Sequence, residues 1–287
     1  MTVAARTVIT DEWIAACEGA RPFMVAAGWG TASGIVASPR ERRGILGRVR
    51  RSTAPRPVAL VAPQWPGLED ADRVARIDDA LSVGLLRGGV AVARIASIEW
   101  SGAPDAGRWV DAVGECLEAA AAGASQPALA GSWLAGCACA LAASRRDDLA
   151  FLVLAGAPSA EVMSRRTPEN EDDPMWESSA ALRLADTLAA LAPLEAVTVG
   201  ARPTLVVQGA VDGLLGASHL EAWRAALAAT GRPSDGIEVA FADAFFRPCD
   251  ERGTADAADD ASLGILAGAV AEWVQRAVSR GPARRAR

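Results

Sequence analysis

The chain has 287 residues, enough for one large domain with an excursion rather than two clear domains. It is 51% hydrophobic and 22% charged, as is usual for a globular protein, and its formal charge of −6 argues against a general nucleic-acid surface. The five cysteines lack zinc-type spacing and there is one histidine, so we expect neither a metal site nor a cofactor.

The composition also bears on where the protein acts. The chain contains no lysine, so its basic side chains are arginines and one histidine. Alanine is abundant, and this composition is typical of a GC-rich bacterial genome. The first thirteen residues have no apolar stretch like that of a signal peptide, and the uncharged stretch 119–144 is divided by glycine and proline. We therefore expect a cytoplasmic protein with reduced thiols and no membrane span.

Short apolar runs alternate with longer amphipathic ones along the chain, which is typical of a parallel sheet covered by helices on both faces. The predicted strands are Phe23–Ala27, Gly34–Ala37, Val58–Ala62, Val90–Ile95, Ala128–Gly131, Ala150–Ala155, Thr204–Gly209 and Ile237–Phe241. The predicted helices are Asp70–Leu86, Gly107–Ala122, Leu134–Ser144, Ser218–Ala229 and Ala261–Ser279. The sequence therefore predicts an α/β fold with a mostly parallel eight-stranded sheet.

One segment, 158–200, interrupts this alternation. It contains an acidic stretch and then an amphipathic helix, Ser179–Leu191, which we expect Pro193 to end. A connection of this length inside a compact domain is usually a functional excursion. We therefore predict a core of residues 1–157 and 201–287 with a lid formed by 158–200.

The segment 131–136 predicts a sharp turn between a strand and a helix. In a nucleophile elbow the positions two before, two after and three after the tip must be small. If Ser132 were the tip, Leu134 would occupy one of these positions and crowd the contact between helix and strand. With Trp133 at the tip, the three positions hold Gly131, Ala135 and Gly136. The register with Trp133 at the tip fits better.

With this elbow the chain resembles the α/β-hydrolase superfamily over roughly residues 21–280. It is most similar to the bacterial serine-hydrolase and dienelactone-hydrolase-like branches, whose elbow reads Gly-x-Ser-x-Gly-Gly. The segment that ends at Asp212 resembles the family's strand ending in Gly-x-x-Asp, which implies the triad acid there. The segment around Ala244 resembles Gly-Ala-Asp-His-Phe-Phe, with alanine in the histidine position. Residues 62–67 resemble an oxyanion turn of the Gly-Pro-Gln form.

The resemblance thus keeps the acid, Asp212, and loses both the nucleophile and the base. An indole at Trp133 has no ionisable nucleophile, and alanine at position 244 cannot accept a proton. Triad catalysis needs a nucleophile bonded to an oriented base, so an ordinary serine hydrolase is not expected. Ser132 is an alternative nucleophile beside the tip. We interpret His219, the single histidine, as a surface or helix-cap residue.

On this fold, ligands bind outside the carboxyl ends of the strands. The residues expected there are acidic, amide-bearing, aromatic or apolar: Gln64, Trp65, Glu99, Trp100, Trp133, Leu134, Trp176, Asp212 and Phe245. Trp133 either fills a closed pocket or lines an aromatic-walled site for a flat or apolar ligand, with Asp212 or Glu99 as the polar anchor.

Three functions remain open at this point. The first is a non-catalytic relative that binds a small molecule or a partner protein. The second is a lyase, cyclase or isomerase in which Asp212 or Glu99 performs acid–base work in a desolvated pocket. The third is residual ester or thioester hydrolysis through Ser132. The apolar face of the final predicted helix packs on the sheet or serves a homodimer.

Overall fold

The computed structural model describes residues 2–3, 15–40, 56–64, 71–102, 105–124, 126–159, 193–199, 202–211, 217–231, 234–250 and 260–279. Its sheet follows the order β2-β3-β5-β4-β6-β7-β8-β9, with β1 paired to β5. The strands are β1 Thr2–Val3, β2 Cys17–Ala27, β3 Gly30–Pro39, β4 Val58–Val61, β5 Ala91–Trp100, β6 Pro127–Ser132, β7 Leu152–Ala155, β8 Thr204–Gly209 and β9 Asp235–Val239. The helices are α2 Ala71–Arg87, α3 Ala106–Ala120, α4 Trp133–Ser144, α7 Pro193–Val199, α8 Ala217–Ala229 and α9 Ala261–Ser279.

The prediction of a mostly parallel α/β sheet is confirmed. Strands β5, β4, β6, β7, β8 and β9 pair in parallel in that order, and β2, β3 and β5 pair antiparallel at the other end. All eight predicted strands are present, and β2 is longer than expected because it forms a hairpin with β3. Every residue of β4, β7 and β8 is buried, as expected where helices cover both faces.

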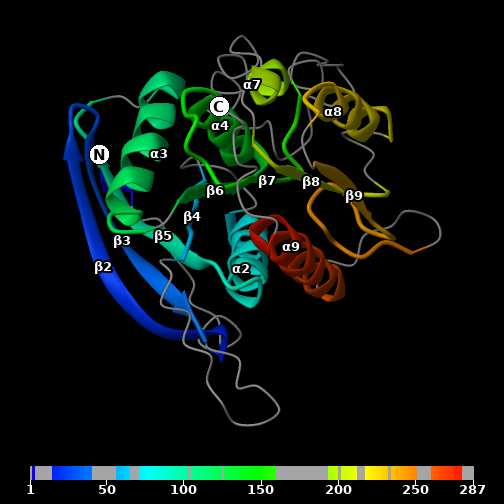
Figure 1. The fold of residues 1–287 in the computed structure, drawn as a ribbon, viewed down its shortest axis with the longest axis horizontal. Coiled ribbons are helices and arrows are strands. Elements are labelled where there is room, and N and C mark those ends of the chain that lie inside the picture. Colours follow the sequence, from blue (N-terminus) through cyan, green and yellow to red (C-terminus); the bar gives the residue numbers. More distant parts are fainter. Residues whose placement is uncertain are drawn as a thin grey trace.

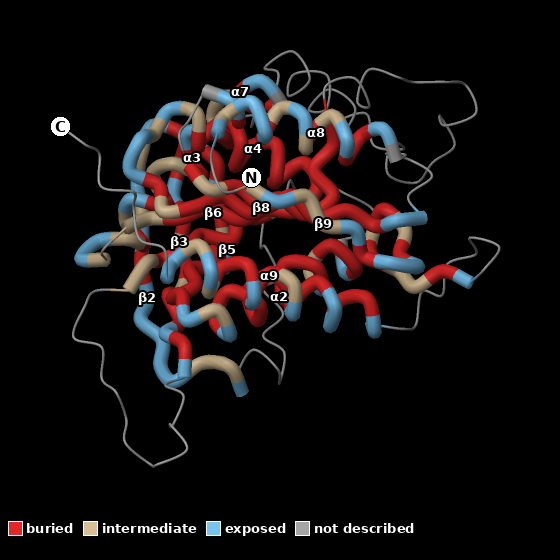
Figure 2. The backbone as a smooth tube through the Cα atoms, turned by 45° about the vertical axis from the view of Figure 1, so that its right-hand side comes forward, coloured by how far each residue is buried: buried red, intermediate tan, exposed pale blue. Residues whose placement is uncertain are grey.

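Two helical layers enclose the sheet (Figures 1 and 2). Helices α3, α4, α7 and α8 cover one face, and α2 and α9 cover the other. The buried apolar residues form two clusters, one between the sheet and α3 and α4 (the α3/α4 cluster) and one between the sheet and α2 and α9 (the α2/α9 cluster). Alternate residues of β6 point to opposite layers, so Leu129 packs in the α3/α4 cluster and Ala130 in the α2/α9 cluster. Most of the apolar face of α9 is buried in that second cluster, as in the first of the two expectations for this helix, whereas Ile265 is exposed.

Of the predicted lid, 158–200, the structure describes residues 158–159 and 193–199. Its amphipathic helix, Ser179–Leu191, lies outside the described residues. Pro193, which we expected to end that helix, is the first residue of α7, a helix that the sequence did not predict. Proline suits the first position of a helix, where its missing N–H would have no partner. Ala196 and Val197 of α7 are buried against α4 within the sheet's own core. In the described residues no helix is long and apolar enough to cross a membrane.

The passage from β6 into α4 leaves no room for side chains at two glycines. A Cβ on Gly131 would lie 2.8 Å from the carbonyl carbon and oxygen of Ala135 and 2.9 Å from Cys139 Sγ. A Cβ on Gly136 would lie 2.7 Å from the Cβ of Ala157. Helix α4 can therefore lie this close to β6 and to the segment after β7 only with glycine at both positions.

We expect Gly131→Ala to lower the free energy of unfolding by about 1–3 kcal/mol, because the added methyl group must push backbone atoms apart. Gly114→Ala in α3 is the matched control, since a Cβ there meets nothing within 4 Å. Removing a glycine from a helix interior should raise stability by roughly 0.5–1 kcal/mol. Urea denaturation measures both, and equal effects of the two substitutions would contradict the close packing.

Candidate functional site

Trp133 forms the tip of the turn between β6 and α4. Its φ is 48°, in the left-handed region that residues with a Cβ rarely adopt. Such a conformation costs of order 1–3 kcal/mol and persists only where the surrounding structure enforces it. Gly131 and Gly136, on either side of the tip, approach their neighbours too closely to carry a Cβ. The small-residue spacing predicted this residue at the tip.

The indole of Trp133 is enclosed, with 2% of the residue exposed. Its ring stacks on that of Phe245, with centroids 4.4 Å apart and planes inclined by 26°. Nε1 lies 3.8 Å from the point where a Cβ on Gly156 would stand, and the carbonyl oxygen of Ala244 lies 3.2 Å from that point. Among the described residues this buried N–H has no hydrogen-bond partner, which is costly away from water.

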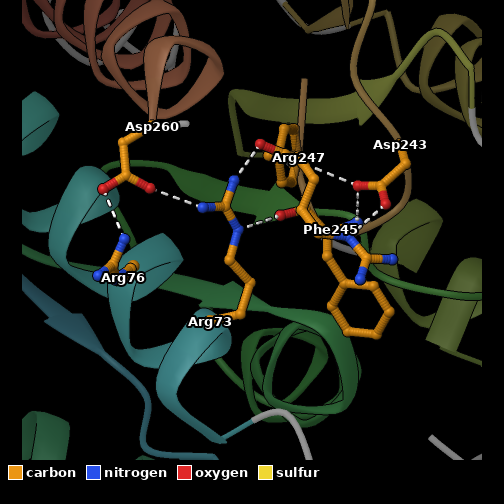
Figure 3. Close-up of polar contacts among 7 residues, drawn as sticks. Arg73, Arg76, Asp243, Phe245, Arg247 and Asp260 are labelled. Atoms are coloured by element: carbon orange, nitrogen blue, oxygen red, sulfur yellow. Dashed lines mark hydrogen bonds and ion pairs between the residues drawn. The ribbon is translucent and has the colours of Figure 1, made fainter. Parts of the chain in front are cut away.

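Phe245 and Ala244 belong to a tight loop, 241–250, that follows β9. The carboxylate of Asp243 organises this loop (Figure 3). Its Oδ1 accepts the backbone N–H groups of Phe245 at 2.9 Å and Arg247 at 2.8 Å, and Oδ2 accepts Arg247 Nε at 2.6 Å. The Arg247 guanidinium carbon lies 5.3 Å from the centroid of the Phe245 ring. The loop thus presents Phe245 to Trp133 in one orientation.

Ser132 is directed away from the tip, toward α2. Its side chain is fully buried, and its hydroxyl donates to Asp78 Oδ1 at 2.7 Å. Gln64, after β4, donates from Nε2 to the Ser132 hydroxyl at 2.8 Å and to the Ser132 carbonyl at 3.0 Å. The hydroxyl therefore joins the oxyanion-turn segment, the elbow and α2. None of its described partners is a base of the histidine type.

Asp78 is the most strongly perturbed carboxyl group of this network. Burial raises its pKa to about 7, against the opposing effects of the Arg94 charge and of hydrogen bonds from Ser132 and Gln64. Arg94 is itself engaged in a buried ion pair with Asp79. Asp78 therefore changes charge near neutral pH behind the elbow. No local pattern indicated this group, because Ser132, its partner at the elbow, lies 54 residues away along the chain.

Other predicted site residues lie elsewhere. Trp100 packs edge-on against Trp29, with ring centroids 5.7 Å apart, in the α3/α4 cluster rather than beside Trp133. Glu99 is exposed on the part of β5 that pairs with β3 and β1. Leu134 is buried in the α3/α4 cluster. The remaining predicted positions lie outside the described residues: Trp65, Trp176 and Asp212.

The interpretation of His219 as a surface residue was wrong. The residue is 4% exposed. Its Nδ1 lies 2.8 Å from Gln208 Oε1, and its Nε2 accepts the N–H groups of Ser159 at 3.0 Å and Trp223 at 3.1 Å. Nε2 is therefore the unprotonated nitrogen, and Nδ1 carries the proton that Gln208 accepts. The buried imidazole thus links α8, β8 and the segment that follows β7.

The cysteines offer no alternative nucleophile. Cys137 and Cys139 on α4 are fully buried, and burial raises the pKa of both thiols well above the usual range. Within the part of the chain that the structure describes, no group of three or more His, Cys, Asp or Glu residues could hold a metal ion.

No protein-family model and no curated protein matches the chain. Solved structures do resemble it. The esterase Est1E from Butyrivibrio proteoclasticus is 15% identical over 91% of this chain and 100% of that chain, with a TM-score of 0.60. A thermostable esterase from Pseudomonas putida is 12% identical over 92% and 83%, with a TM-score of 0.59. A lidless α/β serine hydrolase from Xanthomonas campestris is 17% identical over 90% and 94%, with a TM-score of 0.55.

The protein has the α/β-hydrolase fold. At these identities the likeness concerns the fold and not the activity. In this α/β-hydrolase fold the strand-to-helix turn after β6 carries Trp133, and the loop after β9 carries Ala244 and Phe245. The two segments meet through the Trp133–Phe245 stack at the carboxyl edge of the sheet.

The raised pKa of Asp78 predicts an unusual pH dependence of stability. The folded protein keeps a proton that the unfolded chain loses at its ordinary pKa of 3.8. The contribution of Asp78 to the free energy of unfolding should therefore fall, by up to about 4 kcal/mol, as pH rises from about 4 to about 7.

Asp78→Asn should remove this component, because the amide does not titrate. Urea denaturation across this pH range, compared with wild type, measures the difference. Asp72→Asn, at an exposed position of the same helix, is the control and should leave the wild-type profile in place. Identical profiles for wild type and Asp78→Asn would contradict the buried, protonatable state of Asp78.

Proposed function

We propose that this protein binds a small, flat, largely apolar molecule at its elbow and does not hydrolyse esters by triad chemistry. The proposal rests on one observation: a tryptophan with a φ of 48° stands at the tip of the elbow, its indole buried and stacked on Phe245. An indole cannot attack a carbonyl carbon. The strained backbone at this tip is therefore present although the residue there is not a nucleophile.

The sizes of two residues support the loss of the triad. In the resemblance to serine hydrolases, Trp133 takes the place of a small serine, and Ala244 takes the place of a larger histidine. Both residues belong to the α2/α9 cluster, and both lie near the space beside Gly156. We infer that the indole takes up volume that an imidazole at position 244 would need. The larger side chain at position 133 is thus compensated by the smaller one at position 244.

The unpaired indole N–H supports the binding of a ligand. Among the described residues, Trp133 Nε1 donates to no acceptor although it is buried. A ligand oxygen would satisfy it if the packing around the enclosed indole opened to admit the ligand, and the Trp133 and Phe245 rings would then form an aromatic wall. A planar molecule with one carbonyl or carboxylate acceptor matches these features. Of the two acid–base groups that the sequence suggests, Glu99 lies away from this site on β5, so such chemistry would fall to Asp212, which lies outside the described residues.

A second candidate is a pseudoenzyme that binds a partner protein, with Trp133 as a permanent plug. The 2% exposure of Trp133 favours a plug. The neighbouring edge of the sheet also carries apolar side chains in solvent. Phe241, with a φ of 54°, is 65% exposed, and Val211 beside it is 37% exposed. Val211 N–H donates to the Ala242 carbonyl at 2.8 Å, which places these two side chains on adjoining segments.

We expect wild-type protein to show no turnover of a chromogenic short-chain ester, and Ser132→Ala to be equally silent. Turnover that Ser132→Ala abolishes would instead establish residual hydrolysis through Ser132. The double variant Trp133→Ser, Ala244→His should regain measurable hydrolysis, because it restores a nucleophile and a base.

The same variants test the exchange of volume. Trp133→Ser alone should cost about 3–5 kcal/mol of unfolding free energy through the cavity it leaves. Ala244→His alone should be destabilising through crowding against the indole. The double variant should lose less than the sum of the two. Additive losses would count against the shared volume.

Ligand binding can be tested with ferulic acid, a planar phenolic acid that a solved structure of Est1E contains. We expect calorimetric titration to detect binding to wild type. Trp133→Phe, which keeps a ring but lacks the N–H, should weaken binding about tenfold. Trp273→Phe in α9, packed in the same apolar cluster, is the control and should bind like wild type. Absence of binding to wild type, for ferulic acid and for benzoic acid alike, would favour the plugged pseudoenzyme.

A further inference from the structure

Arg73, on the first turn of α2, makes contacts that the elbow chemistry leaves unexplained (Figure 3). Its side chain is 6% exposed. Nε donates to the carbonyl of Phe245 at 3.0 Å, a terminal nitrogen donates to the carbonyl of Phe246, and the other terminal nitrogen contacts Asp260 at 2.7 Å. One guanidinium therefore joins three segments that are distant along the chain: α2, the loop 241–250 and the start of α9.

The geometry of this contact depends on arginine. The guanidinium presents its donors as a planar fork, which can reach two consecutive carbonyl oxygens and a carboxylate at once. The second of these carbonyls belongs to Phe246, whose φ is 54°. Arg73 thus holds the strained part of the loop from its carbonyl side, while Asp243 holds the N–H groups of Phe245 and Arg247. The peptide groups on both sides of Phe245 are fixed.

Fixing these peptide groups fixes the direction in which the Phe245 ring leaves the backbone. We infer that Arg73 is a positioning residue that sets the Phe245 ring against Trp133 and thereby shapes the aromatic wall of the ligand site. This inference rests on the function proposed above for its bearing on ligands. Its geometric part, the link from Arg73 to the Trp133 environment, stands independently of any ligand.

A purely structural role for Arg73 would give a different result, and Arg76 allows the two to be separated. Arg76 donates to the other oxygen of the same Asp260 at 2.7 Å, so it also ties α2 to the start of α9. Its side chain is 52% exposed, and its described contact is with Asp260 rather than with the loop. Loss of such an exposed pair has little effect on stability. Arg76→Gln is therefore the matched control for Arg73→Gln.

The first measurement observes Trp133 directly. The chain has nine tryptophans, so a ¹⁵N-labelled sample gives up to nine indole N–H resonances, and Trp133→Phe identifies the one from position 133. Arg73→Gln and Arg73→Lys should both shift this resonance, because neither side chain reaches two carbonyls and a carboxylate together. Arg76→Gln should leave it in place. An unshifted Trp133 resonance in a folded Arg73 variant would overturn the inference.

The second measurement concerns affinity. With ferulic acid as the probe, Arg73→Lys should weaken calorimetric binding about tenfold relative to wild type, and Arg76→Gln should not. A shifted Trp133 resonance with unchanged affinity would limit Arg73 to loop geometry and overturn its role in the ligand site. If wild type binds no probe, the proposed function fails, and the resonance measurement alone decides the positioning role. Should Arg73→Gln fail to fold, Arg73→Lys carries both tests.

Discussion

The turn between β6 and α4 is the constraint on which the carboxyl edge of the sheet depends. Glycine at 131 and 136 lets α4 lie against β6 and the segment after β7, and the residue at the tip between them has a left-handed conformation. A side chain at such a tip projects out of the edge of the sheet, whatever its chemistry. Here it is an indole, and the loop after β9 is packed to meet it through Phe245.

Helix α2 connects the parts of this edge with polar side chains that are unusual for a buried helix face. Arg73 holds the loop after β9, Asp78 holds Ser132 at the elbow, and Asp79 holds Arg94 in β5. A buried polar group that loses its partner is costly, so each of these contacts restrains the segment at its other end. Helix α2 therefore holds the elbow and the loop after β9 directly. Gln64, in the segment that resembles an oxyanion turn, is linked to it through Ser132.

Local patterns predicted the fold and the tip of the elbow, because apolar periodicity and small-residue spacing are properties of neighbouring residues. They could not predict that Ser132 would point toward Asp78, 54 residues away along the chain. The burial of His219 was missed for the same reason: Gln208 and Ser159, which engage its two nitrogens, belong to a different strand and a different loop. No local pattern singled out Arg73, because its carbonyl partners lie more than 170 residues away.

The pairing of a large residue at the elbow with a small one in the opposite loop has a consequence for how such a site can change over time. Under the proposed function, each replacement suits the fold chiefly in the presence of the other, because the proposal gives them one shared volume near Gly156. Reversal of either alone would then pass through a less stable protein, and marginal stability leaves little room for that passage. The exchange would act as a ratchet that retains the binding scaffold and separates it from serine hydrolases of the same fold by two steps instead of one.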